Sequence, residues 1–260
     1  MTPHDLPAPL AQAFASLGFP GLSPVQTAVL NASLGDRDLL VSARTGSGKT
    51  VGFGLLIAKA LLEPPLTSAP AALVVAPTRD LALQVRRELA RLLDPLRLEV
   101  TAVVGGMAYS DQIRAIRKGA PVIVGTPGRL CDLVDKGVLD LASLRVLVLD
   151  EADEMLDMGF KDELEALLAT APVERRTLLF SATLPPEALR LAEQYQRDAA
   201  RVAVETEDVH PDITWRGITV RNTEREGALV NLLRLLDVPA VVFVATREGV
   251  LHLHARLVER

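Results

Sequence analysis

The sequence predicts an α/β fold: a doubly wound parallel sheet accompanied by part of a second α/β domain. Six short runs are apolar on successive residues, which is typical of strands covered on both faces. Amphipathic helical stretches separate the runs, and such crossovers join strands that lie parallel. The runs that we expect to form strands are 39–41, 72–75, 100–104, 122–124, 146–149 and 178–180.

The composition indicates a globular protein and excludes several other classes. The 260 residues are 49% hydrophobic, which allows a sizeable core and excludes a disordered or fibrous chain. A single cysteine, Cys131, allows no internal disulfide and no thiolate zinc site, which favours a cytoplasmic location. The long apolar stretch 228–246 contains Arg234 and Asp237, so we expect no membrane span. The net charge of −5 leaves room only for a local nucleic-acid-binding strip.

The stretches between the strands have helical spacing. In 80–93, Leu81, Val85 and Leu89 recur on one side, which predicts an amphipathic helix. A further strand is expected at 201–204, and the polar residues after it are expected to form a linker.

The chain after this linker predicts a second, shorter α/β series. Its expected elements are a strand at 213–220, a helix at 225–236, a strand at 240–244 and a helix at 247–258. About 50 residues are roughly half of what a three-layer domain needs to cover its sheet. We therefore expect a first domain at 1–205, a linker at 206–211, and the incomplete amino-terminal part of a second domain at 212–260.

Polar clusters follow the strands of the first domain directly. The carboxyl ends of parallel strands meet at one edge of the sheet, where open α/β sheets bind ligands. The sequence therefore predicts one large composite site at this edge. The clusters are 43–50, 77–79, 105–106, 126–129, 150–153 and 181–183.

The first cluster has the sequence of a phosphate-binding loop, with Ala43 in place of the usual leading glycine. Its glycines let backbone N–H groups turn toward phosphates, and Lys49 supplies a positive charge to the β- and γ-phosphates. The Thr50 hydroxyl is a ligand for Mg²⁺. The alternative is a glycine-rich turn that merely joins strand to helix. The expected nucleotide-binding residues here are Ala43, Arg44, Thr45, Gly46, Ser47, Gly48, Lys49 and Thr50.

The pair Asp150 and Glu151 closes an apolar strand, where the second half of a nucleotide site is expected. The Asp150 carboxylate would hold Mg²⁺ through water, and Glu151 would polarise the water that attacks the γ-phosphate. The alternative is an acidic helix cap, because Asp and Glu favour the first turn of a helix.

The order and spacing of these clusters resemble the motifs of the DEAD-box RNA helicases. The resemblance covers residues 5–205 as a first RecA-like domain, and 137–195 resembles bacterial members. Residues 242–247 resemble the first motif of the second RecA-like domain. The motifs that carry it are Gly18 with Phe19, Ser23 with Pro24 and Gln26, 43–50, 77–82, 105–106, 126–129, 150–153 and 181–183.

The resemblance assigns roles around the nucleotide. It implies that the Gln26 amide reads the adenine edge, so that the nucleotide is ATP, and that Lys49, Asp150 and Glu151 are catalytic. Ser181 and Thr183 would hydrogen-bond to the 150–153 loop and couple nucleotide state to the RNA surface, with Asp153 as the partner there. The alternative is that Ser181 and Thr183 are ordinary polar residues at the end of a strand, with no coupling role.

The resemblance also implies an RNA path along the same edge. Contacts there go to phosphates and sugars, so RNA binding would be sequence-tolerant and salt-sensitive. For Arg79 and Arg129 the alternative is a solvated charge at a helix start. The expected partner is RNA, with ribosomal or structured RNA as the target class. The expected RNA-binding residues are Pro77, Thr78, Arg79, Gly105, Gly106, Thr126, Pro127, Gly128 and Arg129.

The sequence departs from the family pattern at three places. Met1 stands where family members have an aromatic residue that stacks on adenine, and Asp80 replaces the usual Glu. The sequence contains no Arg-Gly-Xaa-Asp and no His-Arg-Xaa-Gly-Arg segment, which in the family carry the arginine finger and further ATP and RNA contacts. An arginine finger contributes on the order of 10³ to 10⁵ in rate, so we expect ATP binding with poor turnover.

We interpret the chain as an ATP-dependent RNA helicase, an ATP hydrolase that uses Mg²⁺, binds the single-stranded RNA backbone and locally unwinds RNA duplexes. The alternative is a nucleotide-binding and RNA-binding module with little turnover. A DNA-translocating motor is disfavoured by Gln26 and by the sequence of 150–153.

Overall fold

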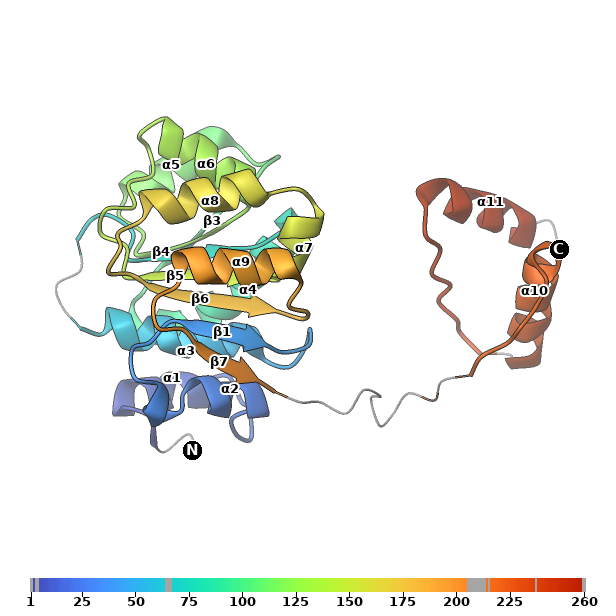
Figure 1. Ribbon diagram of the computed structural model, residues 1–260, viewed down its shortest axis with the longest axis horizontal. Helices are drawn as coiled ribbons and strands as arrows, with labels where there is room; N and C mark the ends of the chain where they lie inside the picture. Colours follow the sequence, from blue (N-terminus) through green and yellow to red (C-terminus); the bar gives the residue numbers. More distant parts are fainter. Residues whose placement is uncertain are drawn as a thin grey trace. The chain divides into compact units, whose positions relative to one another are not determined.

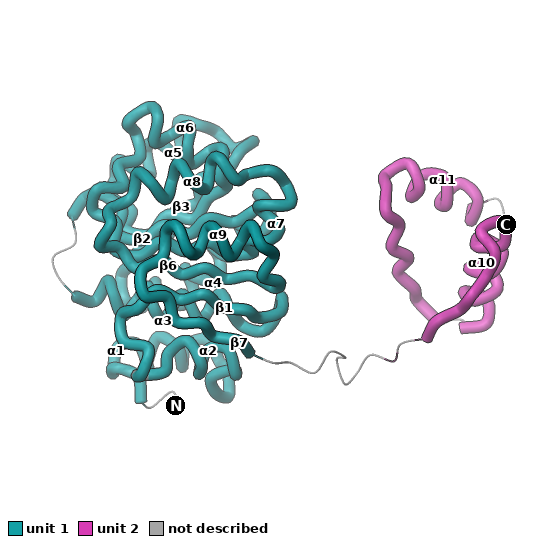
Figure 2. Tube along the Cα trace, in the orientation of Figure 1, with its two compact units in different colours: residues 1–206 teal, residues 207–260 magenta. Residues whose placement is uncertain are grey.

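The computed structural model describes residues 2, 5–63, 67–204, 214, 216–236 and 238–258. The chain divides into two compact units, residues 1–206 and residues 207–260, which Figure 2 shows in different colours. The expected linker at 206–211 lies outside the described residues. No helix in the described part is long and apolar enough to cross a membrane.

Strands and helices alternate through most of unit 1, which begins with two α-helices and has two α-helices between its fifth and sixth strands (Figure 1). All six expected strands of its first 181 residues are present, with ends that differ by at most two residues. The strands are β1 Leu39–Ser42, β2 Ala72–Val75, β3 Val100–Val103, β4 Val122–Gly125, β5 Val146–Asp150, β6 Arg176–Ser181 and β7 Ala200–Ala203. The helices are α1 Ala8–Ala15, α2 Pro24–Val29, α3 Lys49–Leu61, α4 Arg79–Leu93, α5 Tyr109–Arg117, α6 Pro127–Asp135, α7 Ala152–Asp157, α8 Lys161–Thr170 and α9 Pro186–Tyr195.

The seven strands form one sheet in the order β3-β4-β2-β5-β6-β1-β7, and every neighbouring pair is parallel. The predicted doubly wound parallel α/β fold is therefore confirmed. The strand order divides the carboxyl edge into two halves. The ends of β5, β6 and β1 are neighbours, and the ends of β3, β4 and β2 are neighbours.

Each face of the sheet packs against its own set of helices. Successive strand residues point to opposite faces, so Val41 joins a core with α1 to α4 while Leu40 joins a second core with α5 to α9. Both side chains are buried, as the successive apolar residues of the strands require. Figure 1 shows the helices in two layers with the sheet between them.

Unit 2 corrects two sequence predictions. Helices α10 Arg225–Leu236 and α11 Arg247–Val258 have the expected bounds, and a short 3₁₀ turn precedes α10. The strands expected at 213–220 and 240–244 are wrong, because neither 216–220 nor 240–244 is a strand; Ile213 lies outside the described residues. A strand is defined by hydrogen bonds to a neighbouring strand, and no strand pairing occurs in the described part of this unit. Phe243, expected in a strand core, is 92% exposed.

A matched pair of glycines tests the packing at the carboxyl edge. A Cβ added at Gly125 would lie 2.5 Å from the Val103 carbonyl oxygen, whereas one added at Gly128 would meet nothing within 4 Å. Gly125→Ala should therefore lower the free energy of unfolding by about 2 kcal/mol. Gly128→Ala, the control in α6, should leave it unchanged or raise it. Equal urea midpoints for the two variants would contradict this packing.

Candidate active site

The phosphate-binding loop joins β1 to α3 in the backbone form that its glycines permit. Gly46 has φ +80° and Gly48 has φ +91°, a region that residues with a Cβ rarely adopt. Ala43 is tied to β6 by its N–H, which donates to the Ser181 carbonyl at 3.0 Å. Helix α3 begins at Lys49, so its free N–H groups and positive end face this loop. This arrangement is suited to an anion.

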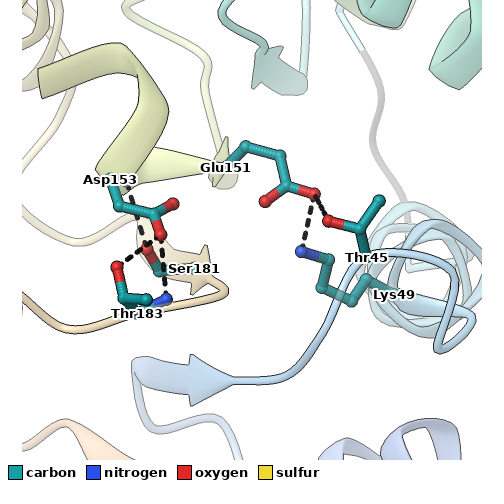
Figure 3. A network of polar contacts seen from close by, with 6 residues as sticks. All are labelled: Thr45, Lys49, Glu151, Asp153, Ser181 and Thr183. Carbon is teal, nitrogen blue, oxygen red and sulfur yellow. Dashed lines mark hydrogen bonds and ion pairs between the residues drawn. The ribbon is translucent and has the colours of Figure 1, made fainter. Parts of the chain in front are cut away.

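Lys49 and Glu151 meet in a buried ion pair. The Lys49 Nζ lies 2.8 Å from Glu151 Oε1, and Thr45 Oγ1 donates to the same oxygen at 3.1 Å (Figure 3). Lys49 is 5% exposed and Glu151 is 7% exposed. Glu151 is the residue before α7, with φ +55°, yet its side chain does not cap that helix. The alternative of a simple acidic cap is therefore excluded for Glu151, whose carboxylate reaches across to the loop.

Asp150 ends β5 beside this pair and is 3% exposed. Burial raises the pKa of Asp150 from 3.8 to about 7, although the positive charge of Lys49 opposes the shift. Its Oδ1 atom is buried and has no hydrogen-bond partner. A buried carboxylate oxygen without a partner needs a donor or a cation for its charged form to be stable.

The residues fit a magnesium ion that is shared with a nucleotide. Mg²⁺ is usually bound by one or two protein oxygen ligands together with substrate phosphates and waters. Asp150 offers the unpartnered oxygen, and Thr50 lies in the first turn of α3 next to Lys49. No group of three or more acidic, His or Cys side chains suited to a metal occurs among the described residues. The fit is therefore to an ion that the phosphates help to hold.

A second polar group links β6 to α7. Asp153 donates its N–H to Ser181 Oγ at 3.1 Å. Its Oδ2 accepts from the N–H of Thr183 at 2.8 Å and from Thr183 Oγ1 at 2.7 Å (Figure 3). These are the hydrogen bonds that the sequence led us to expect. The accepted hydrogen bonds favour the charged form and lower the pKa of Asp153, although partial burial opposes them.

Gln26 lies against the phosphate-binding loop. Its Oε1 accepts from the Ser23 N–H at 2.9 Å, and its Nε2 donates to the Gly48 carbonyl at 3.2 Å. Ser23 Oγ donates to the Ser47 carbonyl at 2.9 Å, so the start of α2 is fixed to the loop at two points. An amide has two donor hydrogens and two acceptor lone pairs. Gln26 therefore retains one of each for a nucleobase.

A cavity of about 710 Å³ opens beside Gln26 and the loop. Sequence reasoning did not place Glu88 or Arg91 there, yet both line this cavity from α4. Phe19 lines it as well and is 50% exposed. The sequence indicated α4 by its helical periodicity. That periodicity does not show which other element each face of the helix contacts. Met1, where the family has its aromatic, lies outside the described residues, as do Pro3 and His4.

The candidate RNA residues gather on the other half of the edge. Arg79 Nη1 donates to the Gly106 carbonyl at 3.2 Å, which joins the segments after β2 and β3. Thr78 caps α4 by accepting the Leu81 N–H at 3.3 Å. Arg79, Gly105, Gly106 and Gly128 are exposed, whereas Pro77 and Pro127 are buried. The two prolines therefore shape the backbone and offer little surface for contact.

Arg129 lies over an aromatic ring that sequence reasoning missed. Its guanidinium carbon is 5.1 Å from the centre of the Tyr109 ring, and Lys136 Nζ is 4.7 Å from the same ring. Arg129 Nη1 is buried and has no hydrogen-bond partner. Thr126 precedes α6, and its N–H donates to the Val103 carbonyl at 3.1 Å. At this part of the edge, Arg129 and Lys136 therefore both lie over the Tyr109 ring, and Arg129 Nη1 is a hydrogen-bond donor without an acceptor.

Comparisons with known proteins show the family of the chain. The sequence model of the family described as "DEAD/DEAH box helicase" matches residues 23–191. The chain is 40% identical to the "ATP-dependent RNA helicase DeaD" of Escherichia coli over 98% of its own length and 40% of that protein. It is also 40% identical to the "DEAD-box ATP-dependent RNA helicase CshA" of Geobacillus kaustophilus, over 92% of this chain and 51% of that one. The chain thus spans about half or less of these relatives.

Solved structures show the same fold. The crystal structure of a DEAD box protein from Methanococcus jannaschii is 34% identical, with a TM-score of 0.71 over 98% of this chain and 69% of that chain. A hypothetical ATP-dependent RNA helicase from Sulfolobus tokodaii is also 34% identical, with a TM-score of 0.68 over 75% of this chain and 56% of that chain.

The raised pKa of Asp150 gives a pH-dependent stability. The folded state holds this proton more tightly than the unfolded state, so its contribution to the free energy of unfolding falls as pH rises from about 4 to about 7. Asp150→Asn removes this titration. Between pH 5 and 8 the wild type should lose roughly 3 kcal/mol relative to the variant in urea unfolding. Parallel curves for the two proteins would show that Asp150 does not titrate in this range.

Proposed function

The chain belongs to the DEAD/DEAH box helicase family, and we propose that it carries the ATP-binding and ATP-hydrolysing machinery of an ATP-dependent RNA helicase. In this proposal it binds ATP with Mg²⁺, grips single-stranded RNA by its backbone and locally separates RNA duplexes in the cytoplasm. Structured or ribosomal RNA is the target class. The observation that carries the proposal is the buried Lys49 and Glu151 pair beside a cavity at the carboxyl edge.

A triphosphate that binds to this loop would have to replace Glu151 as the partner of Lys49. Lys49 is buried, so leaving its charge unpaired is costly, and phosphate oxygens are the replacement partner for its ammonium group. The backbone N–H groups of the loop and of the first turn of α3 would hold the remaining phosphate oxygens. Thr50 and Asp150 would hold Mg²⁺, which when bound neutralises charge on the β- and γ-phosphates.

Glu151 changes its role once Lys49 turns to phosphate. Its carboxylate is then free to accept a hydrogen bond from the attacking water and to orient that water in line with the γ-phosphate. Thr45, which donates to the same Glu151 oxygen, limits where the carboxylate can move. The adenine would lie in the neighbouring cavity, where Gln26 presents its remaining donor and acceptor.

Asp153 would couple the nucleotide site to the segment after β6, and it follows β5, the strand next to the RNA half of the edge. It lies three residues after Asp150 and two after Glu151. It forms hydrogen bonds with Ser181, the last residue of β6, and with Thr183 just after it. A shift of the 150–153 loop on nucleotide binding would therefore move the segment after β6. Arg79 and Arg129 are the charged groups placed to meet RNA phosphates, and the unused Arg129 Nη1 is a ready donor.

The second candidate function is a nucleotide-binding and RNA-binding module with little turnover. It applies to the 260 residues as given, which contain no Arg-Gly-Xaa-Asp and no His-Arg-Xaa-Gly-Arg segment and span about half or less of the curated relatives. Both candidates share the nucleotide and RNA sites, so they differ only in the rate of phosphate release.

Phosphate release with and without RNA separates the two functions. For wild type we expect ATP binding, and slow hydrolysis that single-stranded RNA accelerates. Lys49→Ala should weaken ATP binding by at least tenfold, because one charged hydrogen-bonding partner of the phosphates is lost. Lys118→Ala, at an exposed surface lysine, is the matched control. ATP and RNA binding without release supports the module, whereas unchanged ATP binding by Lys49→Ala contradicts both functions.

Glu151→Gln tests whether phosphate replaces Glu151 as the partner of Lys49 when ATP binds. The substitution leaves Lys49 without a charged partner, so the free energy of unfolding without nucleotide should fall by about 3 kcal/mol. Because phosphate restores a partner, ATP should raise the melting temperature more in the variant than in wild type, and phosphate release should stop. Glu154→Gln, on the exposed side of α7, is the control. Normal phosphate release by Glu151→Gln would remove Glu151 from its proposed role.

A further inference from the structure

A second cavity lies at the opposite edge of the sheet from the candidate active site. Its volume is about 430 Å³, and it opens where β5 and β6 begin and where the chain enters β1 and β7. Because all seven strands are parallel, these amino ends face away from the nucleotide loop (Figure 1). The lining residues are Asp36, Leu56, Lys59, Ala60, Glu63, Arg145, Val146, Glu174, Arg175, Arg176 and Arg197.

The cavity carries an excess of positive charge in a protein of negative net charge. Five of its lining side chains are cationic and three are acidic, which leaves a surplus of two positive charges. The whole chain has a net charge of −5. The acidic members, Asp36, Glu63 and Glu174, are all exposed. Among the cations, Arg175 is buried, Arg145 and Arg176 are half-buried, and Lys59 and Arg197 are exposed.

Backbone carbonyls hold these arginines in place. Arg176 Nε donates to the Arg37 carbonyl at 2.8 Å, and Arg197 Nη2 donates to the Arg175 carbonyl at 3.2 Å. Arg145 Nη1 donates to the carbonyls of Ala60 and Glu63 at the end of α3. A neutral carbonyl fixes the plane of a guanidinium without neutralising its charge. The guanidinium groups of Arg176 and Arg197 are therefore fixed beside the cavity, where they can meet an anion.

Two guanidinium nitrogens lack acceptors. Arg175 is 6% exposed, and its Nη1 donates to the carbonyls of Ala171 and Pro172 while its Nε has no partner. Arg176 Nη2 is also buried and without a partner. The nearby buried carboxylate does not serve them, because Asp38 accepts instead from the backbone N–H groups of Thr177 and Arg197, each at 2.7 Å.

We propose that this cavity binds a phosphate group through Arg176, Arg197 and Lys59. Guanidinium groups match phosphate oxygens in pairs, and the cationic lining favours an anion. The cavity has room for more than a bare phosphate, so the phosphate group of a small phosphorylated molecule or of an RNA backbone fits it as well. Burial lowers the pKa of Arg176, and a bound anion would offset that cost.

Inorganic phosphate is the first probe, with the nucleotide site disabled. In the Lys49→Ala/Glu151→Gln background, the melting temperature should rise with phosphate and saturate at constant ionic strength. Adding Arg176→Gln should raise the phosphate concentration needed for half of that rise by about tenfold. Lys59 is 51% exposed and forms a surface ion pair with Asp36 at 3.7 Å, so Lys59→Gln tests the loss of a second cation at a site where little packing is lost. Arg114→Gln, an exposed arginine on α5, is the charge-matched control and should have no effect.

Two outcomes would overturn the proposal: no saturable rise in the background protein, or the same rise in the Arg176→Gln, Lys59→Gln and Arg114→Gln variants. Saturation distinguishes binding from the general stabilising effect of phosphate as a salt. Fluorescence anisotropy of a labelled RNA oligonucleotide then identifies the source. Weaker RNA binding by Arg176→Gln, but not by Arg114→Gln, assigns the phosphate to RNA. Unchanged RNA binding, with the phosphate effect lost, assigns it to a small phosphorylated molecule.

Discussion

The buried ion pair between Lys49 and Glu151 is the constraint on which the candidate active site depends. It joins two segments that are 102 residues apart, and both charges are almost fully removed from water. A buried charge is stable only with a partner. The pair therefore keeps the phosphate-binding loop and the end of β5 in contact, and it also sets the condition for ligand entry, because Lys49 can leave Glu151 only for another anion.

Ser181 extends this constraint across the sheet. Strand β6 lies between β1 and β5, and the Ser181 carbonyl accepts from the Ala43 N–H while its Oγ accepts from the Asp153 N–H. One buried residue thus contacts the loop on one side and the acidic segment on the other. The strand order places the remaining polar clusters on β2, β3 and β4, so nucleotide and nucleic-acid candidates occupy separate halves of one edge. Asp153 follows β5, the strand that borders the nucleic-acid half, whereas Thr183 follows β6 inside the nucleotide half.

Local patterns in the sequence predicted most of unit 1. Runs such as 146–149 were recognisable because both faces of the sheet are covered, and the glycines at 46 and 48 marked a turn that only glycine adopts easily. The strand order was not predictable, since it depends on packing between distant segments. For the same reason the pairing of Lys49 with Glu151, and the approach of Glu88 and Tyr109 to the site, needed the structure. In unit 2, apolar runs such as 240–244 resembled strands, but no strand pairs with them in the described part of the unit.

The position of Lys49 Nζ in a complex with Mg²⁺ and a non-hydrolysable ATP analogue tests the central claim most directly. We expect a crystal structure to show Nζ moved from Glu151 to the β- and γ-phosphate oxygens, with the Glu151 carboxylate facing a water near the γ-phosphate. An ion pair that stays intact at 2.8 Å while the analogue binds elsewhere, or does not bind at all, would contradict it.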